Sequence, residues 1–291
     1  MVELCSRALQ EGIEEDYVRY LIRRRGLLPD DPLQIGENWP WLIKIYTLRL
    51  FEVVIDDKPL RFGRKAQQKP IELIQVLISM GGRKVAETKI VDILWPDDDG
   101  DMQIKSLHTT VYRLRKLLGY KNVIEYENGR ISFNDKICWI DVWAFERLLG
   151  EADSLLDGKP KPQQVKQLKK KLFSFYQNAF LSQLTDRFWT IQLREKLKSK
   201  FLRVIEGFGN YYLKAGNHKE IINLHLKALE IDPLLESCYQ QIMLSYMKLG
   251  KTSEAANTYR TCARLLRKSL GVEPSKETSM IYKRLRKVVK K

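Results

Sequence analysis

Residues 97–119 carry the pattern that most constrains how this chain folds. Apolar residues recur there at alternating spacings of three and four, which places them on one face of a helix. These residues are Ile104, Leu107, Val111, Leu114 and Leu118. An acidic run at 97–101 precedes this face and Gly119 follows it, as is typical of the two ends of a helix. We therefore expect an amphipathic helix that ends at Leu118.

A β-hairpin pattern follows this helix. Residues 123–126 and 130–133 alternate apolar and polar side chains, and they flank the dipeptide Asn128-Gly129. Asn-Gly between alternating strands is one of the strongest short-range hairpin signals, because both residues tolerate the positive φ angles of a tight turn.

The preceding residues predict strands and then two more helices. Residues 43–53 follow a period of two, and a turn at Asp56-Asp57 leads to a returning strand with Leu60 and Phe62. One helix is expected from Pro70 to Gly81-Gly82 and another from Glu87 to about Trp95. Together these elements predict a winged helix-turn-helix over residues 41–138, preceded by a small antiparallel sheet.

From residue 139 to 291 the pattern is helical and contains a repeat of 34 residues. Gly209, Tyr212, Gly216, Ala228 and Pro233 recur 34 positions later as Met243, Tyr246, Gly250, Cys262 and Arg267. The recurrence of Tyr and Gly in register predicts two tetratricopeptide-like repeats. Because such repeats need neighbours to bury their faces, we expect residues 141–200 and 275–290 to cap them. The fold class is therefore mainly α with a small β component.

Residues 1–40 predict a helical segment and a linker. Apolar residues at helical spacing lead to the basic stretch 23–25 and Gly26, which favour a helix end. These apolar residues are Leu4, Leu9, Ile13, Tyr17 and Leu21. Pro29 and Pro32 cannot continue a helix, so a boundary is expected near 28–38.

The motifs in this order resemble a known family of regulators. The segment 105–119 resembles the recognition helix of OmpR/PhoB-type winged-helix proteins. The segments 138–146 and 270–275 resemble the two ends of the bacterial transcriptional activator domain (BTAD), which follows the winged helix in SARP-type activators. The resemblance covers about residues 43–290 and implies promoter DNA and RNA polymerase as partners. It also implies that residues 1–40 join these domains to a sensor or nucleotide-binding region.

The face of helix 101–118 opposite its apolar stripe supplies the candidate DNA-binding residues. We expect His108, Thr109, Tyr112 and Arg113 to contact bases in the major groove, and Lys105, Arg115 and Lys116 to contact phosphates. The hairpin of residues 123–135 would form the wing, with Arg130 placed for the minor groove or a phosphate. The alternative interpretations are an ordinary solvated helix face and a solvated turn arginine.

The acidic run before this helix has two interpretations. Asp97, Asp98, Asp99 and Asp101 suit the positive end of the helix dipole and could cap free backbone N–H groups. The resemblance instead implies contact with RNA polymerase. Near DNA these carboxylates would repel phosphates, so we expect the loop to point away from the duplex.

The excess of positive charge lies outside the expected winged helix. The chain holds 51 Lys+Arg and 36 Asp+Glu, a net charge of +15. Residues 1–40 hold 5 basic and 8 acidic residues, residues 41–146 hold 17 and 15, and residues 147–291 hold 29 and 13. The helical domain therefore either follows neighbouring phosphates or meets an acidic protein surface, and its lysine runs can also be solvated faces.

Other classes of protein are excluded or disfavoured by simple patterns. No run approaches the roughly 20 apolar residues of a membrane span, and the first 20 residues lack a signal-peptide core, so we expect a cytoplasmic protein with no membrane partner. The four cysteines lie far apart, which favours reduced, buried thiols and no metal site. Scattered histidines and the absence of a glycine-rich phosphate loop or nucleophile motif argue against an enzyme or a cofactor.

Two functions fit these observations. The first is a sequence-specific DNA-binding transcriptional regulator, an activator that reads promoter DNA and contacts RNA polymerase or a partner subunit, with a homodimer on repeated half-sites as one arrangement. The second is an interaction adaptor, whose tetratricopeptide-like repeats bind an acidic partner and whose winged helix is a docking module. Tyr211, Tyr212, Tyr239, Tyr246, Tyr259 and Phe208 are expected in the core of the repeats, although a concave surface between repeats could bind a peptide.

Overall fold

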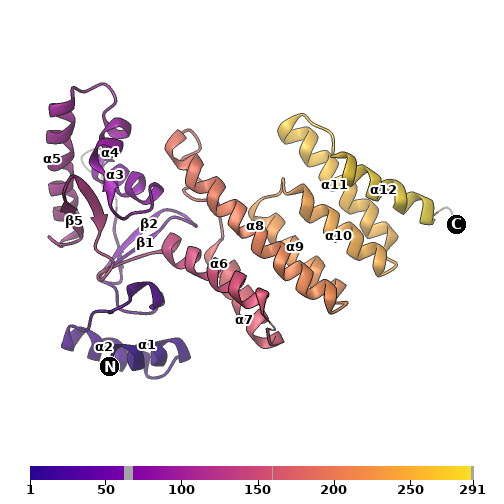
Figure 1. The fold of residues 1–291 in the computed structure, drawn as a ribbon, viewed down its shortest axis with the longest axis horizontal. Helices are drawn as coiled ribbons and strands as arrows, with labels where there is room; N and C mark the ends of the chain where they lie inside the picture. The colour runs from indigo at the N-terminus through magenta and orange to yellow at the C-terminus, as the bar shows by residue number, and fades with distance from the viewer. Residues whose placement is uncertain (62–67, 159, 290–291) are drawn as a thin grey trace. The chain divides into compact units, whose positions relative to one another are not determined.

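The computed structural model describes residues 1–61, 68–158 and 160–289 (Figure 1). These residues form two compact units, which are described separately below. The N-terminal unit consists of residues 1–147 and 180–197, and the C-terminal unit consists of residues 148–179 and 198–291. The expected strand residue Phe62 lies outside the described residues.

Two helices, not one continuous face, form the start of the N-terminal unit. These are α1 (Val2–Glu11) and α2 (Glu15–Arg25). Gly12 adopts the left-handed conformation with φ 70° and ends α1. The buried residues are Cys5, Leu9, Val18 and Ile22. The helix end expected at residues 23–26 is confirmed, but Leu4, Ile13 and Tyr17 are exposed, so the helical spacing across residues 4–21 does not mark one buried face.

The segment 1–40 contacts other parts of the same unit. Arg23 pairs with Asp57, which also accepts from Lys44 Nζ at 3.1 Å. Asn38 Nδ2 donates to the Leu9 carbonyl at 3.4 Å, and a short 3₁₀ helix, η1 (Pro32–Gln34), lies between them in sequence. Trp39 and Trp41 are buried. The Arg23–Asp57 ion pair thus connects the first 40 residues to the turn at Asp56-Asp57 of the same unit.

A four-stranded sheet follows in the order β3-β2-β1-β7. Its strands are β1 (Ile43–Tyr46), β2 (Glu52–Ile55), β3 (Lys58–Pro59) and β7 (Cys138–Ile140). β2 pairs with both neighbours in antiparallel fashion, as expected. β7 instead pairs with β1 in parallel, with Ile43 opposite Cys138. The sheet is therefore mixed, because a strand from nearly 100 residues later completes it.

A buried carboxylate connects this sheet to the next helix. Asp141, the first residue of α6 (Asp141–Asp157), is only 3% exposed. It accepts hydrogen bonds from the backbone N–H groups of Thr47 (2.5 Å) and Leu48 (2.7 Å) and from the Thr47 hydroxyl (2.7 Å). Burial raises the pKa of Asp141 to about 6, against the effect of these donors.

Three helices and a second sheet complete the winged helix-turn-helix. The helices are α3 (Gln68–Ser79), α4 (Glu87–Leu94) and α5 (Gly100–Leu118). The strands β4 (Val85–Ala86), β5 (Ile124–Glu127) and β6 (Arg130–Phe133) pair antiparallel in the order β4-β6-β5.

The Asn-Gly turn has the conformation that the sequence predicts. Asn128 and Gly129 have φ angles of 48° and 68°, as a two-residue hairpin turn requires. The Gly129 carbonyl accepts from the N–H of Glu87 at 2.9 Å, and the N-cap Ala86 provides no side-chain hydrogen bond. The hairpin itself therefore caps α4, since it supplies one of the acceptors that a helix N-terminus needs.

The N-terminal unit also includes part of the segment that the sequence assigns to the helical domain. Residues 139–147 and 180–197 belong to it, including the 3₁₀ helix η3 (Phe188–Thr190). Leu181 N–H donates to the Thr47 carbonyl at 2.9 Å, and Arg194 donates to the carbonyls of Phe180 and Leu181 at 3.1 Å. The division of the chain at residues 40 and 138 stays a prediction.

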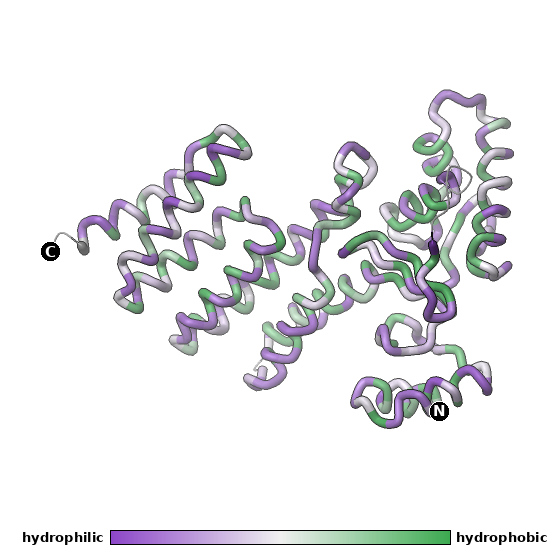
Figure 2. Tube along the Cα trace, turned by 180° about the vertical axis from the view of Figure 1, so that it is seen from behind, coloured by the Kyte–Doolittle hydropathy of each residue, from purple (hydrophilic) through white to green (hydrophobic). Residues whose placement is uncertain are grey.

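The C-terminal unit contains helix pairs of the expected repeat. Its helices are α7 (Pro162–Phe175), most of α8 (Ile191–Lys214), α9 (His218–Ile231), α10 (Glu236–Lys248), α11 (Thr252–Leu270) and α12 (Lys276–Val289). Gly216 and Gly250 have φ angles of 65° and 71° and occupy the turns within the two pairs. Hydrophobic and hydrophilic residues alternate along these helices (Figure 2).

The core of this unit contains several of the expected aromatic residues. Phe208, Tyr212 and Tyr239 are buried, whereas Tyr211, Tyr246 and Tyr259 are half-buried. α12 packs against α10 and α11, and Tyr282 of α12 stacks on Tyr259 with ring centroids 4.1 Å apart. The expectation that the last helix caps the repeats is confirmed.

All four cysteines are within the described residues, where they are buried and free of disulfide bonds. No helix in the described ranges is both long enough and apolar enough to span a bilayer.

Candidate nucleic-acid interface

α5 separates an apolar face from a polar one as its sequence pattern predicts. Leu107, Val111, Leu114 and Leu118 are buried, and Ile104 is half-buried at the start of the helix. The expected polar face is exposed in full. Its residues are Lys105, His108, Thr109, Tyr112, Arg113 and Lys116. Tyr112 is 67% exposed, which is a large apolar area for a helix surface.

The cations on this face are available to an external partner. Lys105, Arg113 and Lys116 form no ion pair with any residue that the structure describes. Thr109 is held more tightly, because its hydroxyl donates to the Lys105 carbonyl one turn earlier at 2.9 Å. The face can therefore offer positive charge, a phenol and an imidazole side by side.

A hydrogen-bond chain connects His108 to the hairpin and to α4. The Tyr126 hydroxyl on β5 donates to Glu87, and His108 Nε2 lies 3.1 Å from the same hydroxyl oxygen. Burial and the Glu87 hydrogen bond raise the pKa of Tyr126 to about 12, so this hydroxyl keeps its proton at neutral pH. Since that proton goes to Glu87, His108 Nε2 must donate to the tyrosine oxygen.

Arg115 faces the hairpin rather than open solvent. Its Nη2 donates to the Ile124 carbonyl of β5 at 2.7 Å, and the residue is half-buried. This hydrogen bond helps to hold β5 of the hairpin against α5. A phosphate contact by Arg115 stays a prediction.

Arg130 at the hairpin lies beside basic residues that the sequence pattern did not identify. Its Nη1 donates to the Lys84 carbonyl at 3.0 Å. Arg130, Lys84 and Lys89 are exposed and line a common cavity of about 510 Å³. Arg130 lies more than 40 residues after Lys84 and Lys89 in sequence, and the pairing of β4 with β6 brings it beside them.

The acidic run before α5 is exposed throughout. Asp97, Asp98, Asp99 and Asp101 all have exposed side chains. Asp99 occupies the N-cap position of α5, but its side chain makes no capping hydrogen bond. The capping interpretation is therefore wrong for Asp99, because the side chain points to solvent instead of to the first turn.

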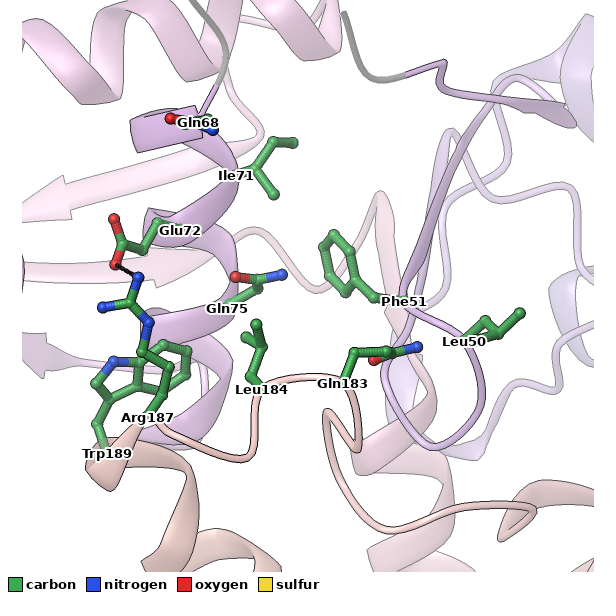
Figure 3. Close-up of a pocket in the computed structure, with 10 residues that line it drawn as sticks. All are labelled: Leu50, Phe51, Gln68, Ile71, Glu72, Gln75, Gln183, Leu184, Arg187 and Trp189. Carbon is green, nitrogen blue, oxygen red and sulfur yellow. Dashed lines mark ion pairs between the residues drawn. The ribbon is translucent and has the colours of Figure 1, made fainter. Parts of the chain in front are cut away.

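A second concavity of the N-terminal unit lacks the charge that a nucleic-acid site needs. It has a volume of about 720 Å³ and lies between the β1–β2 loop, α3 and residues 183–189 (Figure 3). Figure 3 shows Phe51, Leu184 and the amide of Gln75 around its centre. Its ion pair, Glu72 with Arg187 at 3.7 Å, is neutral as a whole. Because the lining of this concavity carries no net charge, α5 and the hairpin are better suited to bind phosphates.

Comparison with known families decides the class of the protein. Residues 140–286 match the family model described as bacterial transcriptional activator domain. The chain belongs to this family. The BTAD match spans α6 to most of α12, and it confirms the resemblance found in the sequence; it indicates a transcriptional regulator. The OmpR/PhoB type of its winged helix stays a prediction.

Named relatives of this BTAD protein agree with that class. The regulatory protein AfsR of Streptomyces griseus is 24% identical over 213 residues, which cover 73% of this chain and 22% of AfsR. The chain thus matches only about a fifth of that relative's length.

Similar solved structures were also found. EmbR of Mycobacterium tuberculosis, solved in complex with a low-affinity phosphopeptide, has a TM-score of 0.58 at 18% identity, covering 85% of this chain and 66% of EmbR. This likeness shows a common fold. The tetratricopeptide-containing domain of a Plasmodium falciparum putative FK506-binding protein reaches a TM-score of only 0.31 at 14% identity, over 52% of this chain.

Proposed function

We propose that this BTAD protein is a sequence-specific DNA-binding transcriptional activator. The observation that carries the proposal is the exposed face of α5, opposite a buried apolar stripe. On it, Lys105, Arg113 and Lys116 have no ion partner among the residues that the structure describes. A recognition helix enters the major groove of promoter DNA, where side chains on its outer face reach base edges.

The four base-contacting residues would differ in what they recognise. Arg113 has the planar fork that pairs with guanine, and Tyr112 and Thr109 offer apolar contacts to thymine methyl groups. In the neutral imidazole, His108 donates through Nε2 to Tyr126, so its Nδ1 is left as an acceptor for a base amino group.

Contacts to the DNA backbone would come from the helix and from the wing. Lys105 and Lys116 lie on the exposed face of α5, and Arg130 lies at the hairpin. We add Lys84 and Lys89 to the phosphate-binding set, because they are exposed beside Arg130. The exposed aspartates 97–101 would stay away from phosphates and face RNA polymerase, the second proposed partner.

Selection of bound sequences from a random DNA pool, with the full chain as the bait, tests this proposal. A defined motif is expected, and two copies at a fixed spacing would indicate binding as a homodimer. Arg113→Ala should then weaken binding to the selected DNA by about 10- to 100-fold, since one good base contact contributes about 1–3 kcal/mol of discrimination. Tyr112→Ala should weaken it as well.

The matched control is Arg264→Ala, which removes an exposed arginine from α11 of the C-terminal unit. It should bind the selected DNA as the unmodified protein does. If Arg113→Ala and Tyr112→Ala also bind that DNA with unchanged affinity, α5 is not the recognition helix.

A further inference from the structure

The C-terminal unit has a groove that the DNA-binding proposal does not use. The groove has a volume of about 860 Å³ and is lined by residues of α7 and α9, with Tyr212 of α8. We propose that this groove binds an acidic peptide segment of a partner protein, with one apolar side chain of the peptide seated on the groove floor. The proposal does not depend on DNA binding by α5.

Unpaired lysines lie on both sides of the groove. Lys166 and Lys170 are four residues apart on α7, so they project from the same face of that helix. Lys227 faces them from α9. All three are exposed, and none forms an ion pair within the parts of the chain that the structure describes. A ligand in the groove would thus meet cations from two directions.

The acidic residues of the groove do not cancel this charge. Glu220 already accepts from Lys169 Nζ at 2.5 Å, and this hydrogen bond lowers the pKa of Glu220. Lys169 also lies over the ring of Tyr212, 4.9 Å from its centroid. Glu230 is the other carboxylate of the lining. The four lysines of the lining therefore exceed its two carboxylates, and the groove favours anions.

The floor of the groove is apolar. Phe173 is half-buried and packs edge-on against Phe201, with ring centroids 5.8 Å apart. Leu224 also lines the groove and is buried, and Leu226 is 45% exposed although it is a large apolar residue. Lys227 lies 5.8 Å from the centroid of Phe173, so a cation borders the apolar surface directly.

This combination fits a peptide better than a nucleic acid. A DNA duplex presents regularly spaced phosphates on a convex surface, and its thymine methyl groups lie inside the major groove, where they cannot reach the floor of a groove lined by Phe173. An acidic peptide can offer carboxylates to the lysines at the edges and an apolar side chain to the floor, as interfaces with an apolar centre and a polar rim do. Concave surfaces between helical repeats commonly bind extended segments.

Fluorescence anisotropy with the full chain tests the proposal. The probe is a labelled peptide, Glu-Glu-Asp-Glu-Phe-Glu-Asp-Glu-Glu, and two matched peptides replace either Phe by Ala or all acidic residues by their amides. The acidic Phe peptide should bind most tightly. The combined variant Lys170→Glu and Lys227→Glu should weaken it by about tenfold or more, because two attractive contacts become repulsive.

Lys171→Glu is the matched control, since Lys171 is an exposed lysine of the same helix that does not line the groove. It should bind the acidic Phe peptide within about twofold of the unmodified protein, as expected for one screened surface charge. Phe173→Ala should reduce binding of the Phe peptide to the level of the Ala peptide. Circular dichroism of each variant verifies the helical fold.

Three results would overturn the proposal. The first is no measurable binding of the acidic Phe peptide by the unmodified protein. The second is an equal loss of binding in Lys171→Glu and in the groove variant, which would mean a diffuse charge effect. The third is that binding of random-sequence DNA requires Lys170 and Lys227, while Phe173→Ala leaves peptide binding unchanged. The groove would then be a phosphate-binding surface.

Discussion

The α5 face of the N-terminal unit and the basic helices of the C-terminal unit use positive charge in different ways. On α5, Lys105, Arg113 and Lys116 have no acidic partner among the described residues. In the C-terminal unit, several cations pair across neighbouring helices. These pairs are Lys169 with Glu220, Lys198 with Asp232, and Arg203 with Asp153.

Net charge gives the opposite impression of the two regions. Residues 41–146 hold 17 basic and 15 acidic residues, whereas residues 147–291 hold 29 and 13. The segment that contains the proposed DNA-binding helix is thus almost neutral, because its basic and acidic residues are nearly equal in number. We therefore base the proposed DNA-binding surface on the placement of unpaired cations among the described residues, and not on the net charge of a segment.

The largest effect is expected at Asp141, the buried carboxylate of the N-terminal unit. The carboxylates of the ion pairs named above for the C-terminal unit are instead partly exposed. Asp141→Asn leaves Thr47 and Leu48 N–H groups facing an amide that can accept fewer hydrogen bonds. We expect a loss of about 1–3 kcal/mol in the free energy of unfolding, the cost of leaving one of these buried donors without an acceptor. Asp232→Asn, at a partly exposed pair with Lys198, should cost at most about 1 kcal/mol. Urea denaturation measures both.

The same aspartate should make stability depend on pH. Its pKa in the folded protein is raised to about 6, above the ordinary value of about 4. The folded state therefore holds a proton that the unfolded state has released, and this contribution to stability is lost as the pH rises from about 4 to 6. Asp141→Asn should remove that slope from the unfolding free energy. An unchanged slope, or equal losses in the two variants, would contradict the contrast between buried and surface charge.

Salt dependence of DNA binding tests the contrast between the two units more directly. Lys105→Ala with Lys116→Ala should reduce the slope of log affinity against log salt by about 2, because each phosphate contact releases about one counterion. Lys283→Ala with Lys287→Ala removes two cations from α12 and should leave the slope unchanged. If the α12 variant reduces the slope equally, the basic helical domain also follows the DNA backbone.

The smallest effect is expected where the β5–β6 hairpin meets α5, the proposed recognition helix. Tyr126→Phe removes the hydroxyl that connects His108 to Glu87 but keeps the ring. We expect affinity for the selected DNA to fall by about two- to fivefold, in line with the loss of one or two hydrogen bonds of modest net energy. Tyr120→Phe is the control, since its hydroxyl bonds to Asp56, away from His108. Equal affinities of the two variants would remove the positioning role of Tyr126.

Local patterns in the sequence account for the elements and the family. The three-and-four spacing of Leu107, Val111 and Leu114 predicts the buried face of α5, since side chains at that spacing share one side of a helix. Asn128-Gly129 predicts the hairpin, and the repeated Gly216 and Gly250 predict the turns between helices. Each of these signals depends on residues within about one turn of helix or one hairpin.

Tertiary structure alone decided which distant residues meet. The parallel pairing of β7 with β1, the Glu87–Tyr126–His108 chain and the position of Lys84 beside Arg130 join residues far apart in sequence. The groove likewise needs α7 and α9 to face each other before Lys170 and Lys227 can act together. Spacing along a chain specifies the face of one helix or strand, but not which other element packs there, because packing depends on the shapes of both surfaces.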